Sequence, residues 1–122
     1  MHQIKLSEVN DSEIKLTQSV LQITDMLGIY HAELARILGL QCSDIGDLYS
    51  AAKYLQKDTT SWQYAECLIK IYEILYDDFS GNEVMMHNWL RKDNKQLSGA
   101  PLYLMVDAQK IKEVLCFLKK EL

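Results

Sequence analysis

The sequence predicts an all-helical fold, and three observations lead to that prediction. Apolar residues recur at the i, i+3, i+4 spacing of amphipathic helices along most of the 122 residues. The chain contains a single proline, so few helices are interrupted. It lacks the alternating runs rich in Val and Thr that are typical of strands. We expect a flexible N-terminus (residues 1–11), a helix-turn-helix domain (12–58) and a second helical domain (60–122).

The N-terminal segment and the first helix are predicted from polarity and capping signals. The first ten or so residues are polar and weakly patterned, so we expect them to fray. Asp11 or Ser12 is suited to cap a helix that ends at Gly28. Its inward face carries four apolar residues, Leu16, Val20, Ile23 and Leu27. This stripe is the first part of the expected core.

Two shorter helices follow, with the pattern of a helix-turn-helix. The first is expected over residues 31–38 and ends at Gly39, and Ser43 caps the second, over residues 44–55. The small side chain of Ala35 lets the two helices approach closely, and Gly39 supplies a left-handed turn. A plain helical hairpin is the alternative interpretation of the same pattern.

DNA recognition by this motif depends on the charge of its second helix. The candidate DNA-binding residues are Arg36, Gln41, Ser43, Asp44, Asp47 and Lys53. Two carboxylates on that helix would be repelled by phosphates, although an aspartate can accept a hydrogen bond from cytosine. We therefore expect intrinsic DNA affinity to be weak or absent.

The second half is predicted to begin with the central helix of the fold. Thr60 or Ser61 caps a strongly apolar segment that reaches Tyr76. Ser80 and Glu83 then fit a capping box, in which each side chain bonds the other residue's backbone. The helix that this box begins contains Val84, Met85, Trp89 and Leu90.

Composition and charge exclude several classes of protein. The 48% of hydrophobic and 25% of charged residues exclude a mainly disordered or fibrous chain. No apolar run approaches the roughly 20 residues of a membrane-spanning helix, and no signal-peptide stretch is present, so we expect a cytoplasmic protein. The net charge is −4, and residues 1–60 carry five basic against eight acidic side chains. This negative charge in the first half disfavours nucleic-acid binding there.

Signals for enzyme chemistry are weak. His2, His31 and His87 are not spaced as metal ligands, and no glycine-rich phosphate loop occurs. The three cysteines are far apart and form no Cys-x-x-Cys pair, which predicts free thiols in a reducing compartment. We therefore expect a protein that is not an enzyme and that uses neither cofactor nor metal.

A loop near the C-terminus combines apolar, polar and basic residues in a specific order. Residues 93–100 are expected to form a turn held by Asn94 and Gly99, after which Pro101 begins a new helical turn. A last amphipathic helix is expected over residues 107–121. The order of residues is Trp89-Leu90-Arg91-Lys92-Asp93-Asn94-Lys95-Gln96-Leu97-Ser98-Gly99-Ala100-Pro101-Leu102.

This stretch resembles the toxin-binding domain of the Xre/MbcA/ParS-type antitoxins of bacterial type II toxin–antitoxin pairs. That domain carries Trp-Leu, Asn and Leu-x-Gly-x-Pro-Leu elements, and all of them occur here at matching spacing. Residues 34–40 are similar to the Xre-type helix-turn-helix of that family, and residues 68–72 to the helix before its loop motif. The resemblance covers residues 14–120. The chain departs from the family pattern in its acidic recognition helix, at residues 80–82 and at Lys110.

The resemblance implies an antitoxin that binds a cognate toxin, of the RES class that consumes NAD, and covers its active site. It also implies a homodimer that represses its own operon. The motif of the toxin-binding domain corresponds to Trp89, Leu90, Asn94, Leu97, Gly99, Pro101 and Leu102.

The candidate residues are divided into two groups by the role expected of each, in the core of the loop or in contact with a partner. Trp89, Leu97, Pro101 and Leu102 are expected to build the core of the loop. Direct contact with a partner is expected from Arg91, Lys92, Lys95, Lys119, Lys120 and Leu122. Such a basic surface would steer the chain toward an acidic partner. Two alternatives remain: a helix-turn-helix transcriptional regulator without a toxin partner, and a helical interaction module that has lost both roles.

Overall fold

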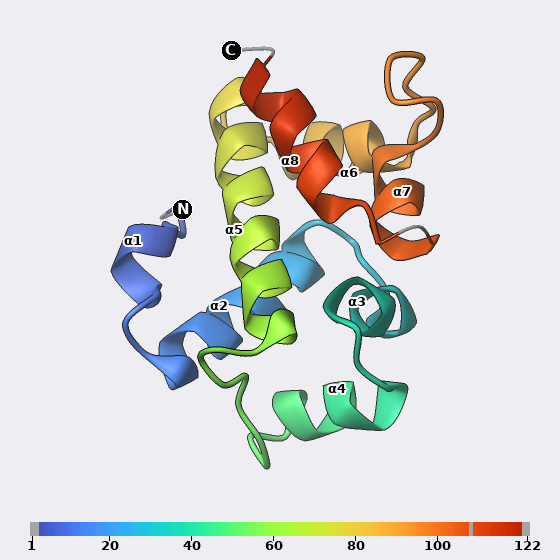
Figure 1. Cartoon of the computed structure of the whole chain (residues 1–122). Helices are drawn as coiled ribbons and strands as arrows, with labels where there is room; N and C mark the ends of the chain where they lie inside the picture. The colour runs from blue at the N-terminus through green and yellow to red at the C-terminus, as the bar shows by residue number, and fades with distance from the viewer. Residues whose placement is uncertain (1–2, 108, 121–122) are drawn as a thin grey trace.

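The computed structural model describes residues 3–107 and 109–120. The fold of this part of the chain is all-helical, as predicted (Figure 1). Its helices are α1 (Leu6–Val9), α2 (Glu13–Met26), α3 (His31–Leu38), α4 (Cys42–Tyr49), α5 (Thr60–Asp78), α6 (Glu83–Arg91), α7 (Pro101–Asp107) and α8 (Ile111–Lys120). No strand occurs in these residues, and one isolated antiparallel bridge pairs Asn94 with Gly99.

The N-terminal segment differs from the expected frayed end, because it packs against α5. Leu6 is buried, and its backbone N–H donates to Oε2 of Glu73 at 3.3 Å. Gln3 donates through Nε2 to Oδ1 of Asp77 at 3.3 Å. The sequence shows that Leu6 is apolar, but no local pattern reveals its contact with α5, because its partner Glu73 lies far away in the chain.

Helix α2 begins and ends where its capping residues predict. The hydroxyl of Ser12 accepts a hydrogen bond from the backbone N–H of Lys15 at 3.2 Å, and Gly28 takes the left-handed conformation after the helix (φ +68°). Its buried Thr17 accepts a hydrogen bond from the backbone N–H of Leu55 at 2.9 Å. This bond fixes the segment after α4 against α2.

The predicted bounds of α4 are wrong at both ends. Asp44, and not Ser43, provides the capping side chain, because its Oδ2 accepts from the backbone N–H of Gln41 at 3.0 Å. The helix therefore begins at Cys42. It ends at Tyr49 instead of near residue 55, because Ala51 adopts φ +63° and the chain turns inward toward α2.

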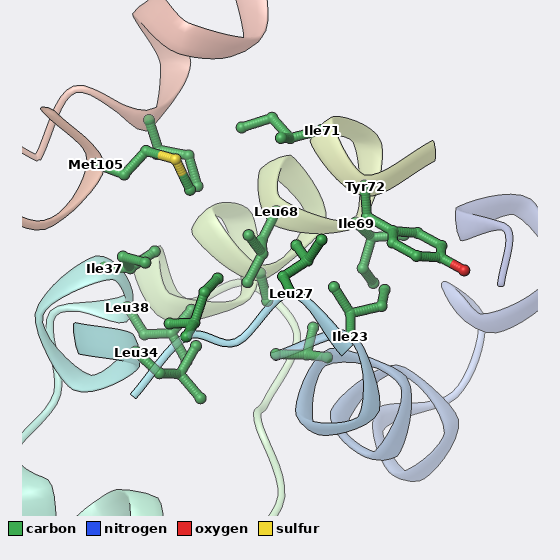
Figure 2. Close-up of a cluster of buried hydrophobic side chains, with 14 of the residues drawn as sticks. Ile23, Leu27, Leu34, Ile37, Leu38, Leu68, Ile69, Ile71, Tyr72 and Met105 are labelled. Carbon is green, nitrogen blue, oxygen red and sulfur yellow. The ribbon is translucent and has the colours of Figure 1, made fainter. Parts of the chain in front are cut away.

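Helix α5 is the central helix, as its apolar width predicts (Figure 1). The predicted cap, Thr60 or Ser61, is wrong: the helix is capped by the hydroxyl of Thr59, which accepts from the backbone N–H of Trp62 at 3.1 Å. The neighbouring Ser61 donates to the carbonyl of Leu38 at 2.8 Å and so joins the start of α5 to the end of α3. Figure 2 shows side chains of α2, α3 and α5 converging with Met105 of α7.

The predicted capping box at Ser80 and Glu83 is wrong. Ser80 lies in the turn before α6 with φ +52°, and the helix is capped by Asn82, whose Oδ1 accepts from the backbone N–H of Met85 at 3.1 Å. The buried face of α6 carries Met86 and Leu90, whereas two apolar residues of the predicted helix, Val84 and Met85, are exposed.

The C-terminal helices differ from the prediction in one boundary. Pro101 occupies the first position of α7, as predicted. The last helix was expected from residue 107, but Asp107 still belongs to α7 and α8 begins at Ile111. Gln109, at φ +50°, lies in the turn between the two helices.

The two predicted domains share one hydrophobic core. Helix α5 packs on α2 and α3 as well as on α8, and α3 also packs on α7. Apolar residues from both halves of the chain form a single buried cluster. The predicted boundary near residue 59 therefore falls at the cap of α5, within one continuous body. No helix among the described residues combines the length and apolarity needed to cross a membrane.

Candidate partner-binding surface

The motif loop of residues 93–100 is closed on itself by Asn94 and Gly99. The backbone N–H of Asn94 donates to the carbonyl of Gly99 at 3.0 Å, and the reverse bond measures 3.3 Å. Oδ1 of Asn94 also accepts from the backbone N–H groups of Gln96 at 3.0 Å and Leu97 at 3.3 Å. The loop projects from the bundle before α7 (Figure 1), with the side chains of Lys95, Gln96 and Ser98 exposed. The sequence therefore locates the turn residues of this loop correctly.

The apolar residues of the motif lie beneath this loop. Leu90, Pro101 and Leu102 are buried, and Trp89 is half-buried against the core. Leu97 is half-buried within the loop. These positions support the division made from the sequence, in which the apolar motif residues have a structural role.

Arg91 has a position that the sequence did not predict. Its Nη2 donates to Oε1 of Glu33 at 2.7 Å and to the carbonyl of Gly28 at 2.8 Å. Its Nε donates to Nε2 of His87 at 3.1 Å, and its guanidinium lies 4.8 Å from the ring centre of Tyr30. The side chain is 32% exposed. Arg91 thus joins the end of α6 to the start of α3, whereas Lys92 and Lys95 are exposed and available to a partner.

The basic end of α8 forms a second part of the candidate surface. Lys119 and Lys120 are exposed, and both this end and the motif loop lie at the upper end of the molecule in Figure 1. Lys70, Lys112 and Lys119 lie close enough to Cys67 to oppose the effect of burial, which raises the pKa of that thiol. Lysines of α5 and α8 therefore share one region. The predicted contact residue Leu122 lies outside the described residues.

Helices α3 and α4 are joined by a short turn, an arrangement shared by a helix-turn-helix and a plain helical hairpin. Gly39 forms the turn after α3 with φ +72°. Nζ of Lys53 lies 3.7 Å from Oδ1 of Asp44 and 3.4 Å from Oδ2 of Asp47. This lysine therefore offsets part of the negative charge of the two carboxylates on α4.

The remaining DNA-binding candidates differ in their contacts. Gln41 and Ser43 are exposed at the start of α4. Arg36 forms an ion pair with α7, in which its Nη1 lies 3.1 Å from Oδ1 of Asp107.

Contacts between aromatic and acidic side chains hold α4 in place. The rings of His31 and Tyr49 stack with centroids 4.3 Å apart, which joins the start of α3 to the end of α4. The hydroxyl of Tyr49 donates to Oδ1 of Asp25 at 3.0 Å. Burial, together with this hydrogen bond and the charge of Asp25, raises the pKa of Tyr49 above its usual value.

A groove follows the seam between α3 and α7, and the sequence did not predict it. One hollow of about 200 Å³ is lined by Glu33, Arg91, Ala100, Leu102, Tyr103, Val106 and Asp107. A second hollow of about 470 Å³ is lined by Arg36, Gly39, Leu40, Val106, Asp107 and Gln109. Asp107 lines both hollows, and its ion-pair partner Arg36 lines the second. No pattern of local spacing could reveal this groove, because its walls come from segments far apart in the chain.

The described part of the chain holds no cluster of metal-ligating side chains and no disulfide. No group of three or more His, Cys, Asp or Glu side chains there is arranged to hold a metal ion. Cys42, Cys67 and Cys116 are free thiols.

A comparison with models of protein families and with curated proteins finds no match for this chain.

Proposed function

We propose that the chain is an antitoxin that binds a cognate toxin of the NAD-consuming RES class and blocks its active site. One observation carries this proposal: the motif residues form one closed loop, bridged by Asn94 and Gly99, on a buried base that includes Pro101 and Leu102. A loop held in one conformation loses little entropy on binding, and this suits a stoichiometric inhibitor. The resemblance of the sequence to the Xre/MbcA/ParS-type antitoxins suggests which class of toxin the partner belongs to.

The contact surface in this proposal consists of exposed lysines. Lys92 directly precedes the loop and Lys95 lies within it. Lys119 and Lys120 lie at the end of α8. A partner with an acidic surface would be attracted to these side chains before the loop docks. Arg91 contributes indirectly, because it fixes the end of α6 from which the loop departs.

Co-expression with the product of the neighbouring gene tests this proposal. We expect a complex that survives purification and restores the growth of cells expressing the toxin. The double variant Lys92→Glu/Lys95→Glu should weaken the complex at least about tenfold, since charge reversal replaces attraction by repulsion. Lys15→Glu, an exposed charge reversal on α2 that changes the net charge by two units instead of four, should leave binding nearly unchanged. Absence of both complex and rescue would contradict the proposed function.

DNA binding by the helix-turn-helix is a second candidate function, acting alone or as autorepression by a homodimer. The pairing of Lys53 with Asp44 and Asp47 favours it, because the acidic side chains of α4 are partly neutralised. We expect a promoter fragment of the chain's own operon to bind at low salt and to dissociate as salt rises. Lys53→Ala should weaken this binding, because it leaves both carboxylates unpaired. A fragment that stays unbound at low salt argues against this role.

A further inference from the structure

The smaller hollow of the α3–α7 groove has the features of a site for one side chain. It encloses about 200 Å³ beside the motif loop, and Ala100, Leu102 and Val106 form its apolar walls. Tyr103 lines the same hollow and is 61% exposed, although it is a large aromatic residue. An exposed aromatic ring beside a hollow is typical of positions that contribute strongly to protein–protein binding.

The two carboxylates of this hollow, Glu33 and Asp107, differ in the number of hydrogen bonds and ion pairs that they already make. Glu33 is fully engaged, since Oε1 accepts from the backbone N–H of Tyr30 at 2.8 Å and both oxygens accept from Arg91. Asp107 makes one ion pair, in which Oδ1 lies 3.1 Å from Arg36. Among the described residues, Oδ2 of Asp107 accepts no hydrogen bond. Asp107 therefore retains the capacity to bind a cation.

The ion pair between Arg36 and Asp107 is easy to replace. The Arg36 side chain is 61% exposed and that of Asp107 is 33% exposed. Exposed pairs contribute little net free energy, because water solvates both partners well when they separate. A cation inserted from outside would thus displace Arg36 at small cost.

We propose that this hollow receives an arginine side chain from a partner protein. Its guanidinium binds Asp107 and stacks on Tyr103, while its aliphatic stem contacts Leu102 and Val106. Arginine fits this combination because it unites a planar cation, which stacks on aromatic rings and bonds carboxylates in pairs, with an apolar stem. Glu33 is already bound by Arg91, whereas Asp107 is paired only with the exposed Arg36, so Asp107 is the carboxylate that attracts an incoming cation. The identification of this partner as the toxin rests on the proposed function.

Binding of argininamide to the free protein tests the site without any toxin. In a nuclear magnetic resonance titration, we expect saturable shifts of backbone amides around the hollow, above all at Leu102, Tyr103 and Asp107. Citrullinamide has nearly the same shape and the same α-amino group but lacks the guanidinium charge, and it should cause no saturable shift at these residues. Equal binding of both compounds, or no saturable shift with argininamide, would overturn the inference.

Three variants separate the groups that carry this binding. Asp107→Asn and Tyr103→Ala should each weaken argininamide binding about fivefold or more, because they remove the ion pair and the stacking surface. Arg36→Gln should have the opposite effect, about a twofold to fivefold gain, because it removes the competitor for Asp107. Asp78→Asn, an exposed change at the end of α5, is the matched control. Unfolding curves establish that each variant is folded, and an Arg36→Gln variant that binds more weakly would contradict the assignment.

The same variants in the co-expression experiment distinguish the two proposals. If the toxin complex forms and Asp107→Asn and Tyr103→Ala weaken it, both proposals are supported. A complex that forms equally well with these two variants overturns the arginine site and leaves the proposed function intact. If no complex forms while argininamide binds, the proposed function fails and the arginine site stands for another partner.

Discussion

At the scale of single residues, Arg91 shows how one side chain connects segments distant in sequence. Glu33 both bonds Arg91 and accepts from the backbone N–H of Tyr30, so the guanidinium supports the first turn of α3. Gly28 contributes a carbonyl to the same guanidinium. Contact between Arg91 and a partner stays a prediction, and the structure shows that this side chain, which is 32% exposed, also has an internal role.

Replacing Arg91 should reduce stability more than replacing its neighbour. Arg91→Met keeps an apolar stem but loses the bonds to Glu33, Gly28 and His87, so we expect the free energy of unfolding to fall by about 1–2 kcal/mol. Lys92→Met, at an exposed position, should change it by less than about 0.5 kcal/mol. Urea unfolding curves compare the two. Equal losses would show that Arg91 does not join α3 to α6.

Two glycines should respond to alanine with opposite signs. At Gly28, φ is +68° and an added Cβ would lie 2.9 Å from Nε2 of His87, so Gly28→Ala should destabilise the fold by about 1–3 kcal/mol. At Gly46, within α4, an added Cβ meets nothing within 4 Å. Gly46→Ala should stabilise by about 0.5–1 kcal/mol, because alanine restricts the unfolded chain. Thermal unfolding gives both signs, and a stabilising Gly28→Ala would contradict the contact with His87.

At the scale of elements, the motif loop depends on local hydrogen bonds and not on a core of its own. Asn94 takes part in five of them, three through its backbone and two through its side chain. The adjoining helices α6 and α7 contribute the buried residues on which it rests. Its conformation is thus set by a few polar contacts, which a single substitution can remove.

Asn94→Ala should loosen this loop without unfolding the bundle. The amide of Gln96 loses its acceptor, whereas that of Leu97 keeps the carbonyl of residue 94. We therefore expect the loop to exchange hydrogen faster, by about tenfold at Gln96, which corresponds to the roughly 1 kcal/mol of a typical hydrogen bond. Hydrogen-exchange mass spectrometry of a peptide covering the loop measures this change. Gln96→Ala alters an exposed side chain and should leave the exchange rate of Leu97 as it is. Unchanged exchange in Asn94→Ala would mean that the side chain does not hold the turn.

At the scale of the whole molecule, one core serves both predicted domains. Helices α2 and α3 of the first half pack on α5 of the second, and α3 packs on α7. Unfolding of a single core is usually cooperative. We therefore expect one transition for the whole chain.

Stability should decrease at high pH. Burial and Asp25 raise the pKa of Tyr49, so the folded state holds this proton more tightly than the unfolded chain, in which tyrosine titrates near pH 10. The contribution is present below about pH 10 and is lost as the pH rises further. Burial also raises the pKa values of Tyr72 and Cys67, which act in the same direction.

Urea unfolding on either side of about pH 10 measures this loss. Tyr49→Phe should have a shallower decrease above that pH than the parent chain, although it gives up the hydrogen bond to Asp25, which costs about 1 kcal/mol at neutral pH. The difference between the two unfolding free energies at several pH values isolates this group. An equally steep decrease in Tyr49→Phe would contradict a role for its hydroxyl.

Prediction from the sequence succeeded where neighbouring residues decide the structure. Ser12 caps α2, Gly39 ends α3 and Pro101 begins α7, and each depends on residues within a few positions. It failed at the start of α6, where two capping signals compete and Asn82 forms the bond expected of Ser80. It also failed at the end of α4, where the helical pattern continues but Leu55 bonds Thr17 of α2.

The sequence by itself determined the helical class, the order of the elements and the turn residues of the motif loop, because these follow from apolar periodicity and short-range hydrogen bonds. Only the tertiary structure decided which candidate charges are available to a partner. Arg91 bonds Glu33, 58 positions away, and Arg36 pairs with Asp107 on α7. The groove between α3 and α7 likewise depends on contacts between segments that are distant in the sequence. Its walls meet only when the shared core brings α3 and α7 together, and no local pattern specifies that contact.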